Sequence, residues 1–281
     1  MTKILITGAN GYLGSEVVST ALKYTTADII ALDLESKNES GERLSYLGLD
    51  LLAHAKDSDL YKKLNYPDII IHLAWQDGFR HNADSHLFNL PAHYAFLKNM
   101  IDSGCRSISV MGTMHEIGYF EGAITEDTPC NPLSLYGIAK NALRQSVLVY
   151  SQDKDVSLKW LRAYYIMGNE EKSQTIFGKI YRMAHEGQKS FPFTTGVNKY
   201  DFISIKDLAH QIIKASMQTE INGIINCCSG VPVALKDKVE NFIKEKKLNI
   251  KPEYGAFPSR KYDSPAVWGD ATLIKKIMER G

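Results

Sequence analysis

Tyr136 and Lys140 are the residues whose types and spacing most clearly allow chemistry. They stand four positions apart in a predicted helix that begins near Ser134, so their side chains share one helix face. A tyrosine with its usual pKa of about 10 is a poor base at neutral pH. A neighbouring cation, helped by an oxidised nicotinamide ring, stabilises the phenolate and lowers that pKa. The pair therefore predicts proton exchange with an alcohol or ketone while hydride moves to or from a nicotinamide.

Thr113 ends a strand predicted over residues 107–113, where its hydroxyl is placed to hydrogen-bond the same substrate oxygen. These three residues also have ordinary structural interpretations. Tyrosine and lysine meet at this spacing by chance on many helices, and a threonine can simply begin a turn. The residues alone leave both interpretations open, so the surrounding elements have to decide between them.

An apolar run at Lys3–Thr7 breaks into three glycines and then continues as a predicted helix. In this order Gly8 supplies the tight turn, Gly11 admits a pyrophosphate next to the backbone, and Gly14 lets the helix lie close to the sheet. The helix amino terminus directs N–H groups and the positive end of its dipole at the phosphates. The pattern predicts a dinucleotide site, although glycine-rich turns also join many strands and helices that bind no ligand.

Asp33 ends the next predicted strand, residues 28–33, about twenty residues beyond the glycines. A carboxylate there accepts hydrogen bonds from the adenosine ribose hydroxyls and repels a 2′-phosphate. No arginine follows in Leu34–Ser36, so NAD is favoured over NADP, while Lys37 keeps NADP open. An ordinary polar residue closing a strand is the alternative interpretation of Asp33.

Strands that alternate with helices predict an α/β fold with a doubly wound parallel sheet of the Rossmann type. We assign residues 1–165 to a dinucleotide-binding Rossmann domain and residues 166–281 to a smaller substrate-binding lobe, some of whose segments return to the Rossmann sheet. Ligands are expected at the carboxyl ends of the strands. The predicted strands cover residues 3–7, 28–33, 45–52, 67–74, 107–113, 156–162, 200–205 and 223–229, and the main predicted helices 87–103, 131–150, 174–186 and 206–217.

The composition is that of an ordinary globular protein, with 281 residues, 44% of them hydrophobic, and a formal net charge of +1. This near-neutral charge argues against nucleic acid as the main partner, and Lys244–Lys247 is interpreted as a solvated helix face. No run approaches the roughly 18 apolar residues of a membrane span, and no signal peptide is expected before the first strand. The four cysteines lack zinc-site spacing, so we expect no metal and a reducing cytoplasm.

Nearly the whole chain resembles a known family, the extended short-chain dehydrogenase/reductases, also called the NAD-dependent epimerase/dehydratase family of nucleotide-sugar enzymes. The resemblance rests on Thr7 with Gly8, Gly11 and Gly14, on Asp33, Asp50-Leu51, His72-Leu73-Ala74, Asn89, Thr113 five residues before Gly118, Tyr136 with Lys140, Leu161-Arg162 followed by Gly168, and Tyr200–Ala209.

The resemblance implies roles for individual residues. It makes Tyr136 the catalytic acid/base, Lys140 its activator and a ligand of the nicotinamide ribose, and Thr113 the hydroxyl that positions the reacting sugar oxygen. Arg260 is similar to a late arginine that clamps the substrate diphosphate, with a solvated surface charge as the alternative. The residues implied to line the cofactor are Gly8, Asn10, Gly11, Tyr12, Leu13, Gly14, Asp33, Asp50, Leu51, Leu73, Ala74, Trp75 and Lys140.

Departures from the family pattern narrow the activity. Met114-His115 stands where the family's 4,6-dehydratases carry an Asp-Glu pair, which argues against dehydration and leaves His115 as a candidate substrate contact. Tyr164-Tyr165 stands where UDP-sugar epimerases commonly carry an asparagine, and Tyr200 where they carry an arginine, so Tyr165 is a further candidate contact. The short segment between Gly168 and Tyr200 is similar to that of the family's sugar ketoreductases.

Three functions follow from these observations. We expect an NAD(P)-dependent oxidoreductase that acts at C4 of a nucleotide-activated sugar, with a 4-ketoreductase as the leading hypothesis. A 4-epimerase that holds NAD tightly is the alternative, and a catalytically silent protein that senses the dinucleotide is the third. The expected partner is a nucleotide sugar. A homodimer through residues 90–100 and 143–150 is possible, although those apolar stripes are equally well explained as core.

Overall fold

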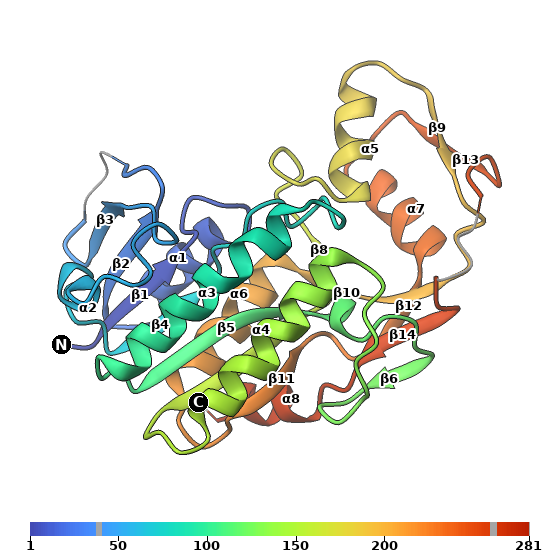
Figure 1. The fold of residues 1–281 in the computed structure, drawn as a ribbon. Helices are drawn as coiled ribbons and strands as arrows, with labels where there is room; N and C mark the ends of the chain where they lie inside the picture. The colour runs from blue at the N-terminus through green and yellow to red at the C-terminus, as the bar shows by residue number, and fades with distance from the viewer. Residues whose placement is uncertain (38–40, 259–262, 281) are drawn as a thin grey trace.

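The computed structural model describes residues 1–37, 41–258 and 263–280. Its main element is a seven-stranded sheet with the order β11-β7-β5-β4-β1-β2-β3, in which every pair of neighbouring strands is parallel (Figure 1). The strands are β1 (Lys3–Thr7), β2 (Asp28–Asp33), β3 (Leu44–Gly48), β4 (Ile69–His72), β5 (Ser107–Thr113), β7 (Ser157–Ala163) and β11 (Gly223–Cys227). The predicted doubly wound α/β fold is confirmed.

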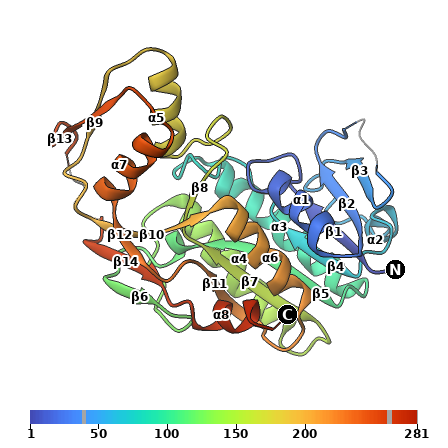
Figure 2. The same ribbon diagram turned by 180° about the vertical axis from the view of Figure 1, so that it is seen from behind.

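Helices cover both faces of this sheet. On one face α3 (Ser85–Asp102) packs beside α4 (Leu135–Ser151), as Figure 1 shows. On the other face α1 (Gly14–Tyr24) packs beside α6 (Ile205–Met217), as Figure 2 shows. Two short helices, α2 (Leu60–Lys63) and α8 (Thr272–Met278), complete this part of the fold.

The core follows from the two-residue period of the strands. Ile4 and Ile6 of β1 belong to the hydrophobic cluster on the α1 and α6 side, while Leu5 belongs to the cluster on the α3 and α4 side. Every residue of β4 and β5 is buried, because helices cover both faces of the sheet at these central strands. The same double cover buries residues 158–163 of β7 on both faces.

A second group of elements forms a lobe beside the carboxyl ends of the main sheet (Figures 1 and 2). One sheet has the order β12-β10-β14-β6, with β8 paired to β10, and a separate pair joins β13 to β9. The remaining elements are β6 (Gly122–Ile124), β8 (Tyr165–Met167), β9 (Ser190–Phe193), β10 (Lys199–Ser204), β12 (Pro232–Ala234), β13 (Lys251–Tyr254), β14 (Ala266–Gly269), α5 (Ile176–His185), α7 (Leu235–Glu245) and the 3₁₀ turn η1 (Met114–Glu116).

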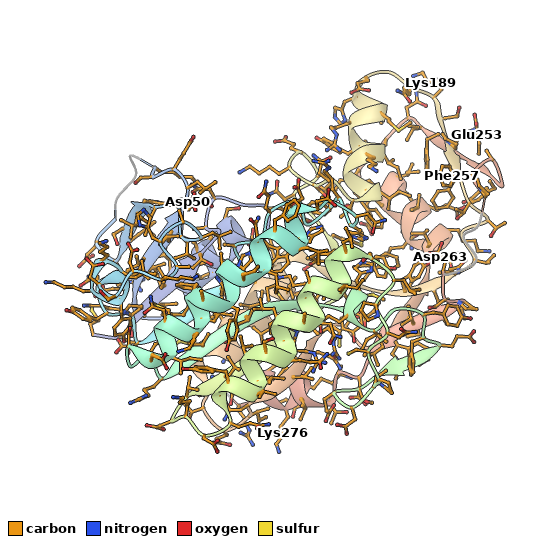
Figure 3. All side chains as sticks on the ribbon, viewed as in Figure 1. Asp50, Lys189, Glu253, Phe257, Asp263 and Lys276 are labelled. Carbon is orange, nitrogen blue, oxygen red and sulfur yellow. The ribbon has the colours of Figure 1, made fainter. Side chains whose placement is uncertain are left out.

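The strand predicted over residues 45–52 ends early, at Gly48. Asp50 turns the chain there, because its Oδ1 accepts the N–H groups of Leu52 and Ala53 at 3.1 Å each. Leu51 is buried in the core on the α3 and α4 side. In Figure 3, Asp50 lies near β2 and β3, at the opposite end of the molecule from Lys189 of the lobe.

None of the helices within the described ranges has the length and apolar character that a membrane crossing needs.

Candidate active site

The turn between β1 and α1 is built from close backbone contacts. Gly8 adopts a φ of +70°, and a Cβ at this residue would stand 2.8 Å from the backbone N of Ala74. A Cβ at Gly14 would stand only 1.9 Å from the carbonyl oxygen of Gly8. Gly11 is less restricted, since its Cβ would meet only that same oxygen, at 3.1 Å. The spacing of Gly8 and Gly14 is therefore a steric requirement of this turn.

Asp33 is tied to the glycine turn. Its Oδ2 accepts the N–H of Asn10 at 2.8 Å, and its Oδ1 accepts the N–H of Leu34 at 2.8 Å. Each oxygen keeps a further lone pair for a ribose hydroxyl. The Oδ1 of Asn10 is buried without a hydrogen-bond partner in the described part of the chain. The Asp33 carboxylate can accept further hydrogen bonds, and the Asn10 amide oxygen lacks a donor. Both lie beside a glycine-rich turn whose backbone a ligand can approach. These features fit a dinucleotide at this end of the sheet.

The loop after β4 meets the same turn. Thr7 Oγ1 accepts the N–H groups of Leu73 and Ala74 at 3.2 Å each, so its own proton is donated to His72 Nδ1, 2.8 Å away. His72 Nε2 then donates to His93 Nδ1 at 3.0 Å. Burial lowers the pKa of His93 to about 3 and holds that of His72 well below its usual value, so both rings are neutral. This chain of hydrogen bonds fixes the two strand ends against α3.

Tyr12 connects the turn to the lobe. Its phenol donates to the carbonyl oxygen of Gly168 at 2.8 Å, and its ring meets Phe79 edge to face, with 6.0 Å between the ring centroids. Burial raises the pKa of Tyr12 to about 12, so the phenol remains a donor at neutral pH. Leu13 precedes α1 and packs against the core.

Thr113, Tyr136 and Lys140 come together at the carboxyl end of β5. Ser134 caps α4 by accepting the N–H of Gly137 at 3.2 Å, which places Tyr136 in the first turn of that helix. The Thr113 side chain hydrogen-bonds the Tyr136 phenol. Lys140 Nζ donates to the carbonyl oxygen of Met111 at 2.8 Å, so all three residues are held against the end of the same strand.

Trp75 covers Lys140. The Nζ atom lies 3.8 Å from the centroid of the indole ring, a cation–π contact. The indole Nε1 donates to His86 Nδ1 at 3.0 Å, and the ring stacks on His93 with 4.4 Å between centroids. Trp75 is thus fixed in place between α3 and α4.

Burial controls the protonation of this site. It raises the pKa of Tyr136, an effect that the Thr113 hydrogen bond opposes and the charge of Glu116 reinforces. It lowers the pKa of Lys140 from 10.5 to about 7, against the opposing effect of Glu116. Desolvation of the phenol thus acts against the lowering of the Tyr136 pKa that is expected from Lys140 and an oxidised nicotinamide ring. The phenol is protonated at neutral pH.

Histidines surround the Tyr136 ring. His81 stacks on it with 5.4 Å between centroids, His86 lies at 5.3 Å, and His115 lies at 6.1 Å. His81 and His115 also meet each other at 4.4 Å. Burial lowers the pKa of His115 to about 3, so it is a neutral ring. Of these three histidines only His115 stands out in the sequence, because His81 and His86 belong to no motif and reach Tyr136 only through the fold.

Of the expected substrate contacts, Tyr165 lies on β8, where its ring packs against Tyr200 and Phe202 with centroids 4.6 and 5.7 Å away. Arg260 lies outside the described residues.

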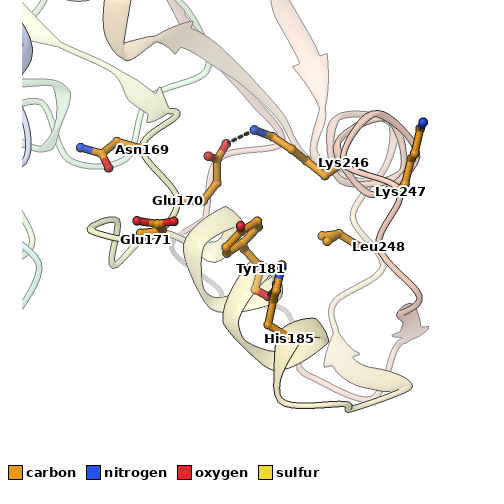
Figure 4. A pocket seen from close by; sticks show the side chains of 8 residues that line it. All are labelled: Asn169, Glu170, Glu171, Tyr181, His185, Lys246, Lys247 and Leu248. Carbon is orange, nitrogen blue, oxygen red and sulfur yellow. Dashed lines mark hydrogen bonds and ion pairs between the residues drawn. The ribbon is translucent and has the colours of Figure 1, made fainter.

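A separate surface pocket of about 480 Å³ lies between α5, the end of α7 and the segment after β8 (Figure 4). Lys246 Nζ pairs there with Glu170 Oε1 at 3.2 Å. Residues 244–247 are all exposed, which confirms the interpretation of this segment as a solvated face. The pocket is lined by Asn169, Glu170, Glu171, Tyr181, His185, Lys246, Lys247 and Leu248, none of which belongs to the candidate active site.

Comparison with known proteins now identifies the family. The model of the NAD dependent epimerase/dehydratase family matches residues 4–228. The chain belongs to this family. It is 47% identical over 270 residues to a dTDP-6-deoxy-L-talose 4-dehydrogenase (NAD(+)) from Aggregatibacter actinomycetemcomitans, covering 95% of this chain and 98% of that protein. It is also 24% identical to UDP-arabinose 4-epimerase 1 from Arabidopsis thaliana, over 98% of this chain and 74% of the relative.

Solved structures share the fold of this family member. UDP-glucuronic acid 4-epimerase from Bacillus cereus, in complex with UDP-glucuronic acid and NAD, superposes with a TM-score of 0.81 at 20% identity, covering 100% of this chain and 94% of that one. UDP-glucose 4-epimerase from Thermotoga maritima gives 0.81 at 19% identity, covering 98% and 92%. The family and the similar dehydrogenase together identify an NAD-dependent enzyme of nucleotide-sugar oxidoreduction. The sequence-based family, fold, cofactor and enzyme class are confirmed.

Proposed function

We propose that the protein reduces the 4-keto group of a dTDP-linked 6-deoxyhexose with NADH, the reverse of the dehydrogenation for which its 47% identical relative is named. The observation that carries the proposal is the meeting of Thr113, Tyr136 and Lys140 at the end of β5, with a half-buried and protonated phenol. A protonated phenol is the form that can donate a proton to a ketone oxygen.

Each residue then has one task. Thr113 donates a hydrogen bond to the C4 oxygen and holds it beside Tyr136. The Tyr136 phenol delivers the proton that turns this oxygen into a hydroxyl, and Lys140 stabilises the phenolate that remains. In the oxidative direction the phenol has to lose its proton first, so that rate rises with pH.

NAD, when bound, supplies or accepts the hydride. The glycine turn from Gly8 to Gly14 holds the pyrophosphate in this proposal, and Asp33 holds the adenosine ribose and favours NAD over NADP. Trp75 and Lys140 lie on the nicotinamide side. The further residues proposed to line the cofactor are Asn10, Tyr12, Leu13, Asp50, Leu51, Leu73 and Ala74.

The substrate is bound between the main sheet and the lobe formed by part of residues 166–281. His115 and Tyr165 contact the sugar nucleotide in this proposal, and Arg260 holds its diphosphate. The neutral state of His115 suits an uncharged sugar, because a neutral imidazole both donates and accepts hydrogen bonds.

The test uses purified protein with dTDP- and UDP-linked 4-keto sugars and the matching 4-hydroxy sugars, each with NADH or NADPH, while nicotinamide absorbance is followed. Loss of absorbance with a dTDP-linked 4-keto sugar supports the reductase. A sugar inverted at C4 without net loss supports the 4-epimerase, the activity for which the Arabidopsis relative is named. Dinucleotide binding without turnover across the panel supports the silent sensor.

A cytoplasmic location and a homodimer through α3 and α4 belong to the same proposal. Phe88 of α3 and Val149 of α4 are 78% and 66% exposed, so both side chains are available for such a contact. Sedimentation equilibrium tests the dimer, since Phe88→Glu should shift it to the monomer and leave NADH binding unchanged.

A further inference from the structure

Glu116 lies behind the catalytic residues and is fully buried. Its Oε1 accepts the N–H of Thr113 at 2.7 Å and the indole N–H of Trp160 at 2.9 Å. Thr113 Oγ1 in turn accepts the N–H of His115 at 3.3 Å. These reciprocal bonds form a capping box that fixes the turn η1, and with it the direction of the Thr113 hydroxyl.

The backbone leaves room for this carboxylate. A Cβ at Gly112 would stand 2.8 Å from Glu116 Oε1 and 2.1 Å from Trp160 Nε1, so only glycine at this position of β5 admits the arrangement. Glu116 therefore packs directly against the strand that ends in Thr113.

Two arginines face the other carboxylate oxygen. Arg162 Nη2 lies 3.5 Å and Arg144 Nε 3.7 Å from Glu116 Oε2. Both arginines have further partners, since Arg162 donates to the carbonyl oxygen of Thr125 at 3.2 Å and Arg144 to Asn141 Oδ1 at 2.8 Å. Loss of the Glu116 charge would leave each guanidinium one acceptor, but it would also remove the counter-ion of the fully buried Arg162, whose Nε and Nη2 have no hydrogen-bond partner in the described part of the chain. The unfolding free energy of each Glu116 variant is therefore measured beside its kinetics.

We propose that Glu116 is a positioning residue for the reaction: its carboxylate holds the Thr113 backbone and so orients the Thr113 hydroxyl toward Tyr136, and its charge acts on Tyr136 and Lys140. The inference rests on the proposed function, because it assigns a task within that site. Glu116 acts through Thr113 and does not itself touch the sugar.

The electrostatic part has a definite sign. The negative charge of Glu116 raises the pKa of both Tyr136 and Lys140, so its removal lowers both. In the reductive direction, the loss of activity at high pH should then begin at a lower pH. The titratable or charged groups that face Tyr136, Lys140 and Glu116 in the described residues are His72, His81, His86, His93, His115, Arg144, Arg162 and Tyr164.

Two substitutions separate geometry from charge. E116Q keeps an oxygen that can accept the Thr113 and Trp160 N–H groups but removes the charge. E116D keeps the charge but shortens the side chain by one methylene, so the oxygen no longer reaches the Thr113 N–H. E126Q is the matched control, because Glu126 is an exposed glutamate in the segment after β6.

We expect E116D to lower kcat about 10- to 100-fold with an unchanged pH profile, because small misplacements of reacting groups have effects of this size. We expect E116Q to keep kcat within about threefold at its optimum and to move the high-pH limb down by about half a pH unit or more. KM for the sugar should change less than kcat in both variants, and E126Q should match the wild type.

Hydrogen exchange gives a readout that does not depend on turnover. The Thr113 amide should exchange faster in E116D than in the wild type, and should stay protected in E116Q. Full kcat and wild-type protection in E116D overturn the positioning role, and an unmoved pH limb in E116Q overturns the electrostatic role. An inactive wild type contradicts the proposed function itself, and the inference falls with it, whereas an active wild type with an unaffected E116D contradicts only the inference.

Discussion

The two ends of the candidate site are built by different means. At the dinucleotide end, Gly8, Gly14 and Asp33 act through backbone geometry and hydrogen bonds to main-chain N–H groups. At the catalytic end, the titratable side chains of Tyr136 and Lys140 are tuned by desolvation and by the charge of Glu116. Substitutions that add side-chain atoms should therefore disrupt the dinucleotide end, whereas changes in pH or in a titratable residue should alter the catalytic end. The following predictions test this difference, beginning with the largest effect.

Tyr136→Phe should lower kcat at least about 100-fold, because it removes the proton donor. NADH affinity should remain nearly intact, since the phenol contributes to proton transfer rather than to the dinucleotide end. Stopped-flow turnover and fluorescence titration measure the two quantities. Retention of more than about a tenth of the wild-type rate would contradict the general-acid role.

Gly14→Ala should destabilise the folded protein by about 2–3 kcal/mol or abolish folding, because the new Cβ would stand 1.9 Å from the Gly8 carbonyl oxygen. Gly41→Ala is the control, since its Cβ would meet nothing closer than the Leu44 Cβ at 3.6 Å. Urea unfolding compares them. Equal stabilities of the two variants would show that the turn is not sterically restricted.

The stability of the wild type should rise between pH 7 and pH 9 relative to Lys140→Met, by about 1–2 kcal/mol. The sign follows from burial, which lowers the pKa of Lys140 to about 7. The unfolded chain keeps this amine protonated up to about pH 10, so it binds more protons than the folded state in that window, and raising the pH favours folding. Unfolding free energies at both pH values measure the difference, and parallel curves would contradict the desolvation of Lys140.

Asp33→Ala should weaken NADH binding about tenfold and reduce the preference over NADPH, because it removes the acceptor for ribose hydroxyls and the repulsion of a 2′-phosphate. Its structural effect should be small, since each carboxylate oxygen accepts only one main-chain N–H. Isothermal titration with both cofactors tests this, and an unchanged preference would remove Asp33 from the site.

The difference between the dinucleotide end and the catalytic end also explains which parts of the fold and the site could be predicted from the sequence. The glycine turn and the strands of the main sheet follow from local sterics and apolar runs, and Tyr136 and Lys140 were found because helix periodicity relates them. Glu116, His81 and His86 reach the site from separate elements. No fixed sequence spacing relates them to Tyr136, so no motif indicates that they lie near it. The three-residue strands β6, β8 and β12 are too short for periodicity to indicate them.

The pKa of Tyr136 shows a second limit of the sequence. The spacing to Lys140 indicated a lowered value, but the direction depends on how deeply the phenol is buried and on Glu116, neither of which the spacing contains.

Hydride transfer to C4 is the central claim, and deuterium tests it most directly. NADH carrying deuterium at the C4 position of its nicotinamide ring, on the transferred face, is incubated with a dTDP-linked 4-keto-6-deoxyhexose, and the product is analysed by NMR and mass spectrometry. The account predicts one deuterium at C4 of the sugar for each NAD formed. Deuterium that remains on the cofactor while the sugar is released unreduced would contradict it.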